Sequence, residues 1–421
     1  MRFIHAADLH IDSPLSGLGS YEDAPIELFR TATRLAFSEL VNKALRERVS
    51  FVILAGDIFD GAWKDWNTGM FFVRETARLR EAGIHVIVKR GNHDAELDQT
   101  MSLPLPDNVH VFRSNAPETF SFEFTGGVKV ALHGQSFARA AVVDNLASSY
   151  PPVIPGSINI GVLHTGLEGH TEHASYAPCS LEQLRLKDYQ YWALGHIHQH
   201  QIYNETPWIV MPGNLQGRHI REPGARGAVL VNTEHGELQR PERFFVDVVR
   251  WDVVHVDISG CTTREEAVRR AAQAFEKAVE GAQGRPLACR VQLTGKSEAH
   301  AQIFGREQQL RAELTAQALA VARDALWIEK VKVQSAPAVD STIIASRADA
   351  LADLQTLFDQ AKQDPDLMTT LQQEFELLLS KMPPDVFKQD VSALNAVKEG
   401  RLGELVAKVA PSLLDRIMQE T

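Results

Sequence analysis

The chain has 421 residues, more than one ordinary hydrophobic core accommodates, so two or three domains are expected. Its apolar content of 44% and charged content of 23% are typical of a soluble globular protein. The net charge of −11 excludes a general nucleic-acid-coating protein, because non-specific binding depends on Lys and Arg that neutralise phosphates. A nucleic-acid function would therefore require local positive charge, from a basic patch or from bound metal.

The cysteines and the apolar runs bear on the cellular compartment. Cys179, Cys261 and Cys289 are scattered without a CxxC spacing, which argues against a disulfide framework or a zinc–thiolate site and indicates a reducing cytoplasm. The opening "MRFIHAADLH" has no basic stretch followed by an apolar run, so no secretory signal is expected. No window holds about eighteen consecutive apolar residues, so no membrane span is expected.

The first part of the chain, residues 1–246, alternates β-rich runs with helical patterns. The compact apolar runs "RFIHAA" and "SFVILAG" predict strands, and the apolar spacing over residues 26–48 predicts a helix between them. A second helical pattern, "TGMFFVRETARLREAG", leads into a strand at "IHVIVK". Further strands are predicted at "VKVALHG", "INIGVLH", "YWALGH", "PWIVMPG" and "GAVLVN". This rhythm predicts a strand-rich, layered α/β domain.

The pattern changes near "RWDVVHVDISG". Residues 251–258 alternate as a strand, and the Thr start and acidic first turn of "TTREEAVRRAAQAFEKAVEGA" predict a helix. A strand at "PLACRVQLTG", a helix over residues 305–325 and a strand at "LWIEKVKVQ" complete a small α/β domain at residues 247–338. After the linker-like "SAPAVD", residues 339–421 form a third, C-terminal region whose pattern is helical from residue 346 onward.

Five short polar clusters follow predicted strands. In α/β sheets, ligand sites form at the carboxyl ends of strands, so these clusters are expected to converge. Carboxylate, imidazole and amide-oxygen ligands together suit divalent first-row cations of the manganese, iron or zinc type. In a D-x-H or H-x-H pair on an extended segment both side chains point to the same face, so the pair can bind one ion or two neighbouring ions. The clusters are "DLH" (Asp8, His10), "GD" (Asp57), "GNHD" (Asn92, His93, Asp94), "LHTG" (His164) and "GHIH" (His196, His198).

Seven candidate ligands exceed the needs of one tetrahedral site with an open position, but they suit two metals that share a carboxylate. Asp57, the single acid after a buried strand, is the natural bridge. Two cations a few ångström apart activate a water and stabilise both ends of a phosphoryl displacement. His93 would donate a proton to the leaving oxygen or hold a non-bridging phosphate oxygen, with Asp94 orienting it.

Each cluster read singly has an ordinary structural explanation. "GNHD" alone is typical of a turn, and only the ordered set predicts a dinuclear site. Asp60 either supports His10, meets substrate or is a solvated loop acid. The basic loop over residues 212–226 is either a charged surface loop or a contact for a nucleic-acid backbone; its cationic candidates are Arg218, His219, Arg221 and Arg226. Three further histidines lie near the clusters, either as supporting groups or by chance: His170, His173 and His200.

The ordered clusters resemble the calcineurin-like metallophosphoesterase superfamily, whose pattern runs D-x-H, GD, GNH[DE], H, GHxH. The segments "MRFIHAADLHIDSPLSGL", "GDIFDG" and "PGNLQGRHIRE" are similar to the SbcD/YhaO type of DNA repair exonuclease. The resemblance implies a mixed α/β (α+β) fold, a four-layer β-sandwich flanked by helices, with a small α/β cap and a C-terminal helical region. It also implies a ligand set: Asp8, His10 and His198 on the first metal, Asn92, His164 and His196 on the second, Asp57 bridging, and His93 beside the scissile phosphate.

The resemblance further implies two divalent ions, usually Mn²⁺, a cap that helps to position DNA, a homodimer, and C-terminal helices that dock on an SMC-like ATPase. Archaeal and eukaryotic relatives have a second phosphate-facing His where this chain, like bacterial members, has Asp60. The expected activity is a Mn²⁺-dependent DNA exonuclease or endonuclease. The alternatives are a small-molecule phosphodiesterase or phosphatase of the same superfamily, and a scaffold held by its C-terminal helices.

Overall fold

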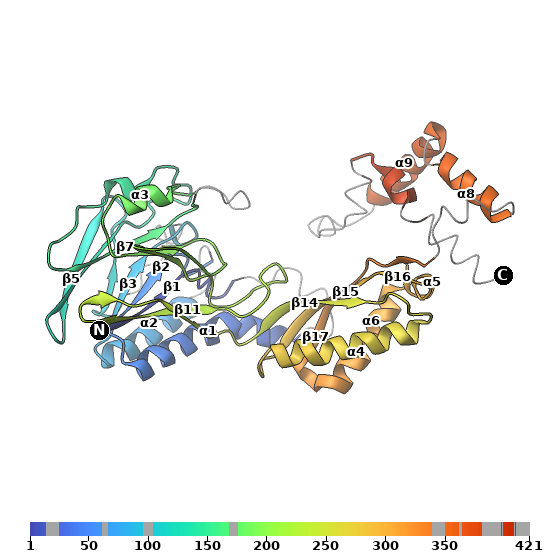
Figure 1. Ribbon diagram of the computed structural model, residues 1–421. Coiled ribbons are helices and arrows are strands. Elements are labelled where there is room, and N and C mark those ends of the chain that lie inside the picture. The colour runs from blue at the N-terminus through green and yellow to red at the C-terminus, as the bar shows by residue number, and fades with distance from the viewer. Residues whose placement is uncertain are drawn as a thin grey trace. The chain divides into compact units, whose positions relative to one another are not determined.

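The computed structural model describes residues 1–13, 25–60, 66–95, 104–167, 176–338, 350–361, 364–380, 397, 399–407 and 409. They form two compact units, Met1–Trp251 and Asp252–Thr421 (Figure 1). His170, His173 and much of the region 339–421 lie outside the described residues. Among the residues described, no helix has the length and apolar character that a membrane span requires.

The first unit contains two sheets. In the larger one the strand order is β12-β11-β1-β2-β3-β4, and β13 also pairs with β11. Strands β1 to β4 run parallel, so their carboxyl ends share one edge, and β11 is antiparallel to β1. The strands are β1 (Arg2–Ala6), β2 (Phe51–Ala55), β3 (His85–Lys89), β4 (Val109–Val111), β11 (Gly227–Glu234), β12 (Glu237–Leu238) and β13 (Glu242–Phe245).

The second sheet has the order β5-β6-β7-β8-β10-β9. Strands β6, β7, β8 and β10 are parallel, and the antiparallel strands β5 and β9 form the two edges. The strands are β5 (Glu118–Phe124), β6 (Val128–Gly134), β7 (Ile158–His164), β8 (Tyr191–Gly195), β9 (Gln201–Glu205) and β10 (Trp208–Met211).

The two sheets pack face to face between helical layers. Alternate residues of β2 show why its sequence is a continuous apolar run: Val52 and Leu54 pack under helices α1 (Ile26–Glu47) and α2 (Trp66–Glu81), whereas Phe51 and Ile53 face the second sheet. The far side of the second sheet packs against η3 (Leu146–Ser149) and α3 (Leu181–Arg185). Figure 1 shows α1 and α2 on one side and α3 on the other. The expected four-layer sandwich is confirmed.

The second unit has a smaller α/β layer. Strands β14 (Arg250–Asp257), β15 (Leu287–Thr294) and β17 (Leu326–Val333) form one sheet, and their apolar side chains share a core with α4 (Arg264–Gly281) and α6 (Glu307–Ala322). Helix α4 begins after Thr263, whose hydroxyl accepts a hydrogen bond from the Glu266 amide. Further elements among the described residues of this unit are β16 (Lys296–Ser297), α5 (His300–Ile303), η4 (Arg323–Ala325), β18 (Ala336–Pro337), α8 (Ala350–Ala361) and α9 (Pro365–Ser380).

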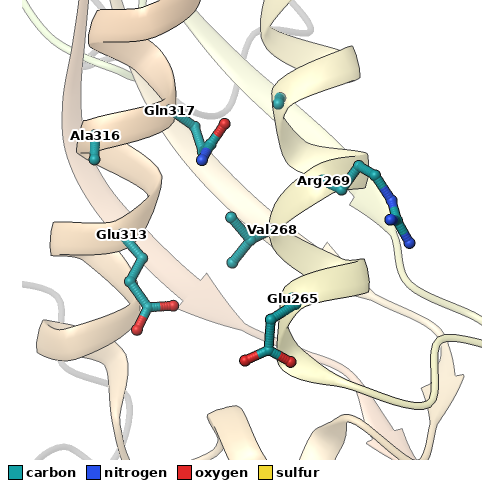
Figure 2. A pocket seen from close by; sticks show the side chains of 7 residues that line it. Glu265, Val268, Arg269, Glu313, Ala316 and Gln317 are labelled. Atoms are coloured by element: carbon teal, nitrogen blue, oxygen red, sulfur yellow. The ribbon is translucent and has the colours of Figure 1, made fainter.

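A groove of about 470 Å³ runs between α4 and α6 on the helical side of this unit (Figure 2). Its lining residues are Glu265, Val268, Arg269, Ala272, Glu313, Ala316 and Gln317. The small side chains of Ala272 and Ala316 leave the space open, and none of the seven is a histidine or a cysteine. The metal-type chemistry that the sequence predicts therefore lies elsewhere, at the strand ends of the first unit.

Candidate metal centre

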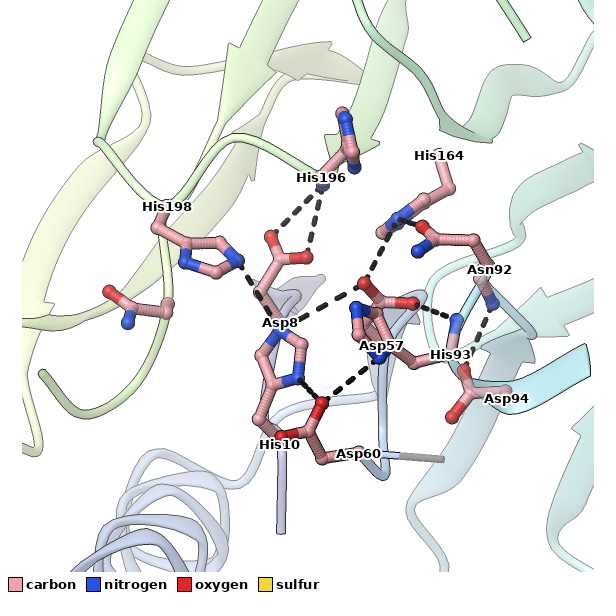
Figure 3. Close-up of polar contacts among 12 residues, drawn as sticks. Asp8, His10, Asp57, Asp60, Asn92, His93, Asp94, His164, His196 and His198 are labelled. Carbon is pink, nitrogen blue, oxygen red and sulfur yellow. Dashed lines mark hydrogen bonds and ion pairs between the residues drawn. The ribbon is translucent and has the colours of Figure 1, made fainter. Parts of the chain in front are cut away.

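The five polar clusters converge at the carboxyl ends of strands from both sheets (Figure 3). Asp8 and His10 follow β1, Asp57 follows β2, and Asn92 follows β3 of the first sheet. His164 ends β7, while His196 and His198 follow β8 of the second sheet. The structure thus brings together all seven side chains that the sequence singles out, although they come from widely separated parts of the chain.

Hydrogen bonds tie these loops to one another. Within the first sheet, the Asp8 amide donates to the Gly56 carbonyl at 3.0 Å, and the His10 amide donates to the Asp57 carbonyl at 3.0 Å. Between the sheets, the His196 amide donates to both carboxylate oxygens of Asp8, at 3.1 and 3.0 Å. The Asp8 carboxylate is therefore tied to the loop that carries His196, which joins the strand ends of the two sheets.

The backbone is strained at this cluster. Four of the seven residues have left-handed φ angles: Asp8 (52°), His10 (44°), Asp57 (50°) and His196 (103°). Such conformations cost non-glycine residues of the order of 1–3 kcal/mol each and persist where the surrounding structure enforces them. Concentrated strain of this kind is typical of a functional site.

Glycines in two of the motifs are required by close approach. A Cβ on Gly91 of "GNHD" would lie 2.2 Å from Asp57 Oδ1 and 2.7 Å from the Asp57 amide nitrogen. A Cβ on Gly195, which precedes His196, would lie 2.1 Å from the Ala55 carbonyl oxygen and 2.9 Å from His164 Nδ1. These positions let the loops of different strands pack against each other at van der Waals distance.

The first ligand group contains Asp8, His10 and His198, whose candidate ligand atoms all lie within 4.8 Å of one another. The His10 and His198 Nε2 atoms are 3.3 Å apart. On the other side of its ring, His198 Nδ1 lies 2.6 Å from Glu222 Oε1. Because a carboxylate oxygen only accepts, that nitrogen carries the proton, and in the neutral ring Nε2 presents a lone pair to the group.

The second group contains Asp57, His164 and His196, again within 4.8 Å. His164 Nδ1 donates to the Ala55 carbonyl at 2.9 Å, so its Nε2 points at Asn92 Oδ1 (3.1 Å) and Asp57 Oδ2 (3.3 Å). Burial acts to lower the pKa of His164, but the nearby Asp57 carboxylate outweighs it and raises the pKa above its ordinary value. This position therefore attracts positive charge.

Asp57 lies between the two groups. Its Oδ2 is 3.9 Å from His10 Nε2 of the first group and 3.3 Å from His164 Nε2 of the second. Its Oδ1 accepts a hydrogen bond from the His93 amide at 3.1 Å. Although burial acts to raise the pKa of Asp57, the surrounding histidines hold it well below its usual range.

The donor set fits two divalent cations. Buried carboxylate, amide and imidazole atoms face one another at 3.1–3.9 Å, and each of the two rings His164 and His198 has its other nitrogen bonded to an acceptor. Nitrogen and oxygen donors of this kind suit first-row divalent ions, and the shared Asp57 suits a pair of them.

His93 lies beside these groups and is oriented by Asp60. Asp60 Oδ1 is 2.9 Å from His93 Nδ1 and 3.4 Å from His10 Nδ1, and Asp60 Oδ2 accepts from the Ser13 hydroxyl at 2.7 Å. The hydrogen bond that His93 Nδ1 donates to the Asp60 carboxylate raises the pKa of His93. The His93 side chain is 43% exposed, whereas those of His10 and His164 are 1% and 0% exposed. His93 can therefore meet a substrate that the buried histidines cannot reach.

Asp94 is expected from the sequence to orient the His93 ring, but its side chain contacts backbone amides instead. Asp94 is buried and accepts hydrogen bonds from the amides of Ile58 (3.1 Å), Phe59 (2.9 Å) and Gly91 (2.9 Å). It turns inward because these amides would otherwise be unsatisfied in the buried loops. Asp94 thus joins the "GD" loop to the "GNHD" loop, and Asp60 supplies the carboxylate at the His93 ring.

The basic residues of the loop between β10 and β11 differ in their positions relative to the site. Arg218 Nη1 lies 3.2 Å from the Ser13 hydroxyl and 3.7 Å from Asp60 Oδ2, so its guanidinium borders the site. His219 is half exposed, with Nε2 3.8 Å from Glu222 Oε1. Arg226 is buried and donates to the carbonyls of His198 and Pro223, so it holds the loop in place instead of facing a nucleic acid.

Glu222 is the site residue that the sequence reasoning missed. Besides its contact with His198, its Oε2 accepts from the Arg218 amide at 2.8 Å and from Asn214 Nδ2 at 3.0 Å. Burial acts to raise the pKa of Glu222, but the hydrogen bond from His198 and the charge of Arg218 hold it well below its usual range. Its only signal in the sequence is that it is the single acid in the basic loop 212–226.

Comparisons with known proteins match two regions of the chain. Residues 1–200 match the calcineurin-like phosphoesterase family, and residues 251–336 match the middle domain of metallophosphoesterase YhaO. The chain is 34% identical to the uncharacterized metallophosphoesterase YhaO of Bacillus subtilis, over 70% of this chain and 72% of that protein. The chain belongs to the calcineurin-like metallophosphoesterase family. The resemblance described from the motifs is thereby confirmed.

More distant members carry names that bear on substrate. The DNA double-strand break repair protein Mre11 of Methanopyrus kandleri is 27% identical over 64% of this chain and 62% of its own length. One component of the nuclease SbcCD of Escherichia coli is 25% identical over 65% of this chain and 75% of its own length. As a member of the metallophosphoesterase family, the chain is a hydrolase of phosphoesters.

Proposed function

We propose that this metallophosphoesterase is a DNA nuclease subunit that hydrolyses phosphodiester bonds with two divalent cations, Mn²⁺ being the expected metal. The observation that carries the proposal is the pair of ligand groups sharing Asp57, with the exposed His93 beside them. Asp8, His10 and His198 would hold the first cation, Asn92, His164 and His196 the second, and Asp57 would bridge them.

The roles of the chain's own groups follow from their positions. Two cations held there would supply an activated water and neutralise the charge that develops on the phosphate. His93, with Nδ1 bonded to Asp60, keeps its other ring nitrogen available to donate a proton to the leaving oxygen or to bind a non-bridging oxygen. Asp60 positions both His93 and His10, and Arg218 and His219 are the candidate contacts for the rest of the substrate.

DNA is the proposed substrate because relatives named as Mre11 and as part of a nuclease match 64% and 65% of the chain. With a net charge of −11, the chain leaves DNA binding to the cations, to Arg218 and His219, and to the cap, residues 247–338. In this proposal the chain consists of a nuclease domain at residues 1–246, this cap, and a C-terminal helical region at residues 339–421.

Two surfaces support the proposed partners. Helix α9 exposes a set of large apolar residues, which suits docking of an SMC-like ATPase: Leu367, Phe375, Leu377 and Leu378. Leu35 of α1 and Trp66 and Met70 of α2 are also exposed; Arg34 lies 5.4 Å from the Phe71 ring, so these turns are neighbours. Such a patch suits a homodimer contact.

The buried, free cysteines fit a cytoplasmic location.

The test is a nuclease assay on the purified full chain with Mn²⁺ and with single- and double-stranded DNA, with and without a candidate ATPase. The expected result is Mn²⁺-dependent cleavage that His93→Ala lowers about 100-fold or more, in line with general acid catalysis. His235→Asn, at an exposed turn remote from the motifs, is the matched control and should retain activity. Absence of cleavage under all conditions, or full activity of His93→Ala, would refute the proposal.

The net acidity favours a second candidate, a small-molecule phosphodiesterase or phosphatase with the same two-metal site. An acidic surface repels a polyanion but tolerates a small phosphoester. Bis-p-nitrophenyl phosphate and a panel of cyclic nucleotides distinguish the two. Turnover of a cyclic nucleotide far above that of DNA at equal Mn²⁺ would select this candidate.

A further inference from the structure

A fully buried lysine lies behind the second ligand group. Lys89 is the last residue of β3 and its exposed fraction is 0%. Because side chains alternate along a strand, Lys89 points to the same side as Ile87, into the core between the two sheets. An ammonium buried in an apolar core is strongly unfavourable unless nearby groups compensate its charge.

The groups that compensate the charge of Lys89 lie at the carboxyl ends of the strands, next to the two ligand groups. Lys89 Nζ donates to the Arg90 carbonyl at 3.2 Å and lies 3.8 Å from the centre of the Phe137 ring. Phe137 in turn makes an edge-on contact with His164, with ring centres 5.7 Å apart. The Phe137 ring thus lies between Lys89 and the second ligand group. Lys89 is also the register partner of Ala55, whose carbonyl accepts the His164 Nδ1 hydrogen bond.

Lys89 and the ionisable groups near it change each other's pKa values. Burial lowers the pKa of Lys89 to about 7, and the carboxylates of Asp57 and Asp94 oppose that shift. In turn, the charge of Lys89 acts to lower the pKa of His164. A cation fixed at this place thus stabilises Asp57 and Asp94 and repels any other positive charge bound near His164.

We propose that Lys89 is a charge-balancing cation behind the metal centre: it offsets the carboxylates of Asp57 and Asp94 and weakens the binding of the cation that Asp57, Asn92, His164 and His196 would hold. This inference rests on the two-cation assignment made under the proposed function. Its consequence is a second cation that binds more weakly, and exchanges more readily, than it would beside a neutral side chain.

The test measures cation binding, not activity. Metal-stripped full-length protein is titrated with Mn²⁺ by calorimetry at pH 6.5 in four forms: unsubstituted, Lys89→Gln, Lys89→Met and Lys187→Gln. Lys89→Gln keeps an N–H donor for the Arg90 carbonyl but removes the charge. Lys187 is the matched control, because its Nζ also bonds backbone carbonyls, those of Ser148 (2.8 Å) and Tyr150 (2.6 Å), away from the ligand groups.

Both neutral Lys89 variants are expected to bind the second Mn²⁺ roughly tenfold more tightly, because a charge repulsion across a low-dielectric core is removed. They are also expected to have a lower thermal midpoint without metal, which saturating Mn²⁺ restores. Lys187→Gln should bind Mn²⁺ as the unsubstituted chain does.

Affinities of both neutral variants within twofold of the unsubstituted chain, or weaker, would overturn the role of Lys89 while leaving the metal assignment intact. Variants that stay insoluble at saturating Mn²⁺ would also overturn it, since Lys89 would then be needed for packing alone. An unsubstituted chain that binds no Mn²⁺ would overturn both proposals.

Discussion

His10 and His198, which follow strands of different sheets, direct their Nε2 atoms at each other across 3.3 Å. Two such nitrogens share a proton or a cation, and Asp8 and Asp57 nearby favour the cation. We therefore expect saturating Mn²⁺ to raise the free energy of unfolding, by about 2.7 kcal/mol at 100 times the dissociation constant. Thermal unfolding with Mn²⁺ and with EDTA measures this.

The control for this prediction replaces a proposed ligand. His198→Ala should lose most of the Mn²⁺-dependent shift, whereas replacing a histidine of the second unit, His300→Ala, should retain it. An equal shift in the His198 variant would show that the cation binds elsewhere on the chain.

In the proposed metal site, Glu222 would support the first cation through its contact with His198. Replacing it by glutamine keeps an acceptor for the His198 Nδ1 proton but removes the charge that makes the ring a stronger donor. We expect Glu222→Gln to weaken the first Mn²⁺ by about 10- to 100-fold, and Glu222→Ala to weaken it further. Calorimetric titration separates the two binding events, and a loss confined to the second one would contradict this role.

Asp60 sets the protonation of His93. The pKa of His93 is raised chiefly by its hydrogen bond with Asp60, so Asp60→Asn should lower that pKa. If protonated His93 donates to the leaving oxygen, the rate falls as pH rises through its pKa. The alkaline limb of the pH–rate profile should then move to lower pH in Asp60→Asn. A profile that keeps its shape and loses only amplitude would indicate a structural role for Asp60.

The proposed strand-end ligands are predictable from sequence because each follows a short apolar run that is typical of a buried strand. In β2, all five residues are buried, and the next polar side chain, Asp57, necessarily emerges at the sheet edge. The same holds for His164 after the fully buried β7. Local pattern therefore fixes where these residues point.

Other features depend on tertiary contacts that no local pattern encodes. The strand rhythm alone predicts only a layered α/β domain, because nothing in "ETFSFEF" indicates that β5 opens a second sheet. Glu222 contacts His198 from a loop 24 positions away in the sequence. Asp60, and not Asp94, contacts the His93 ring, because Asp94 accepts hydrogen bonds from backbone amides of neighbouring loops. The sequence pattern makes Lys89 the polar end of a strand, although its side chain lies in the core.

Gly91 supplies the last prediction. A methyl group there would meet Asp57 Oδ1 at 2.2 Å and the Asp57 amide at 2.7 Å, and neither atom can yield without moving the carboxylate that is proposed to bridge the cations. Gly91→Ala should lower the free energy of unfolding by about 1–3 kcal/mol, as overpacking does, and should also weaken Mn²⁺ binding.

At Gly281, the last residue of α4, a Cβ meets nothing within 4 Å, so Gly281→Ala should be neutral or stabilising by up to about 1 kcal/mol. Urea unfolding and Mn²⁺ titration of both variants test this; unchanged metal binding in Gly91→Ala would mean that Asp57 does not bridge from its observed position.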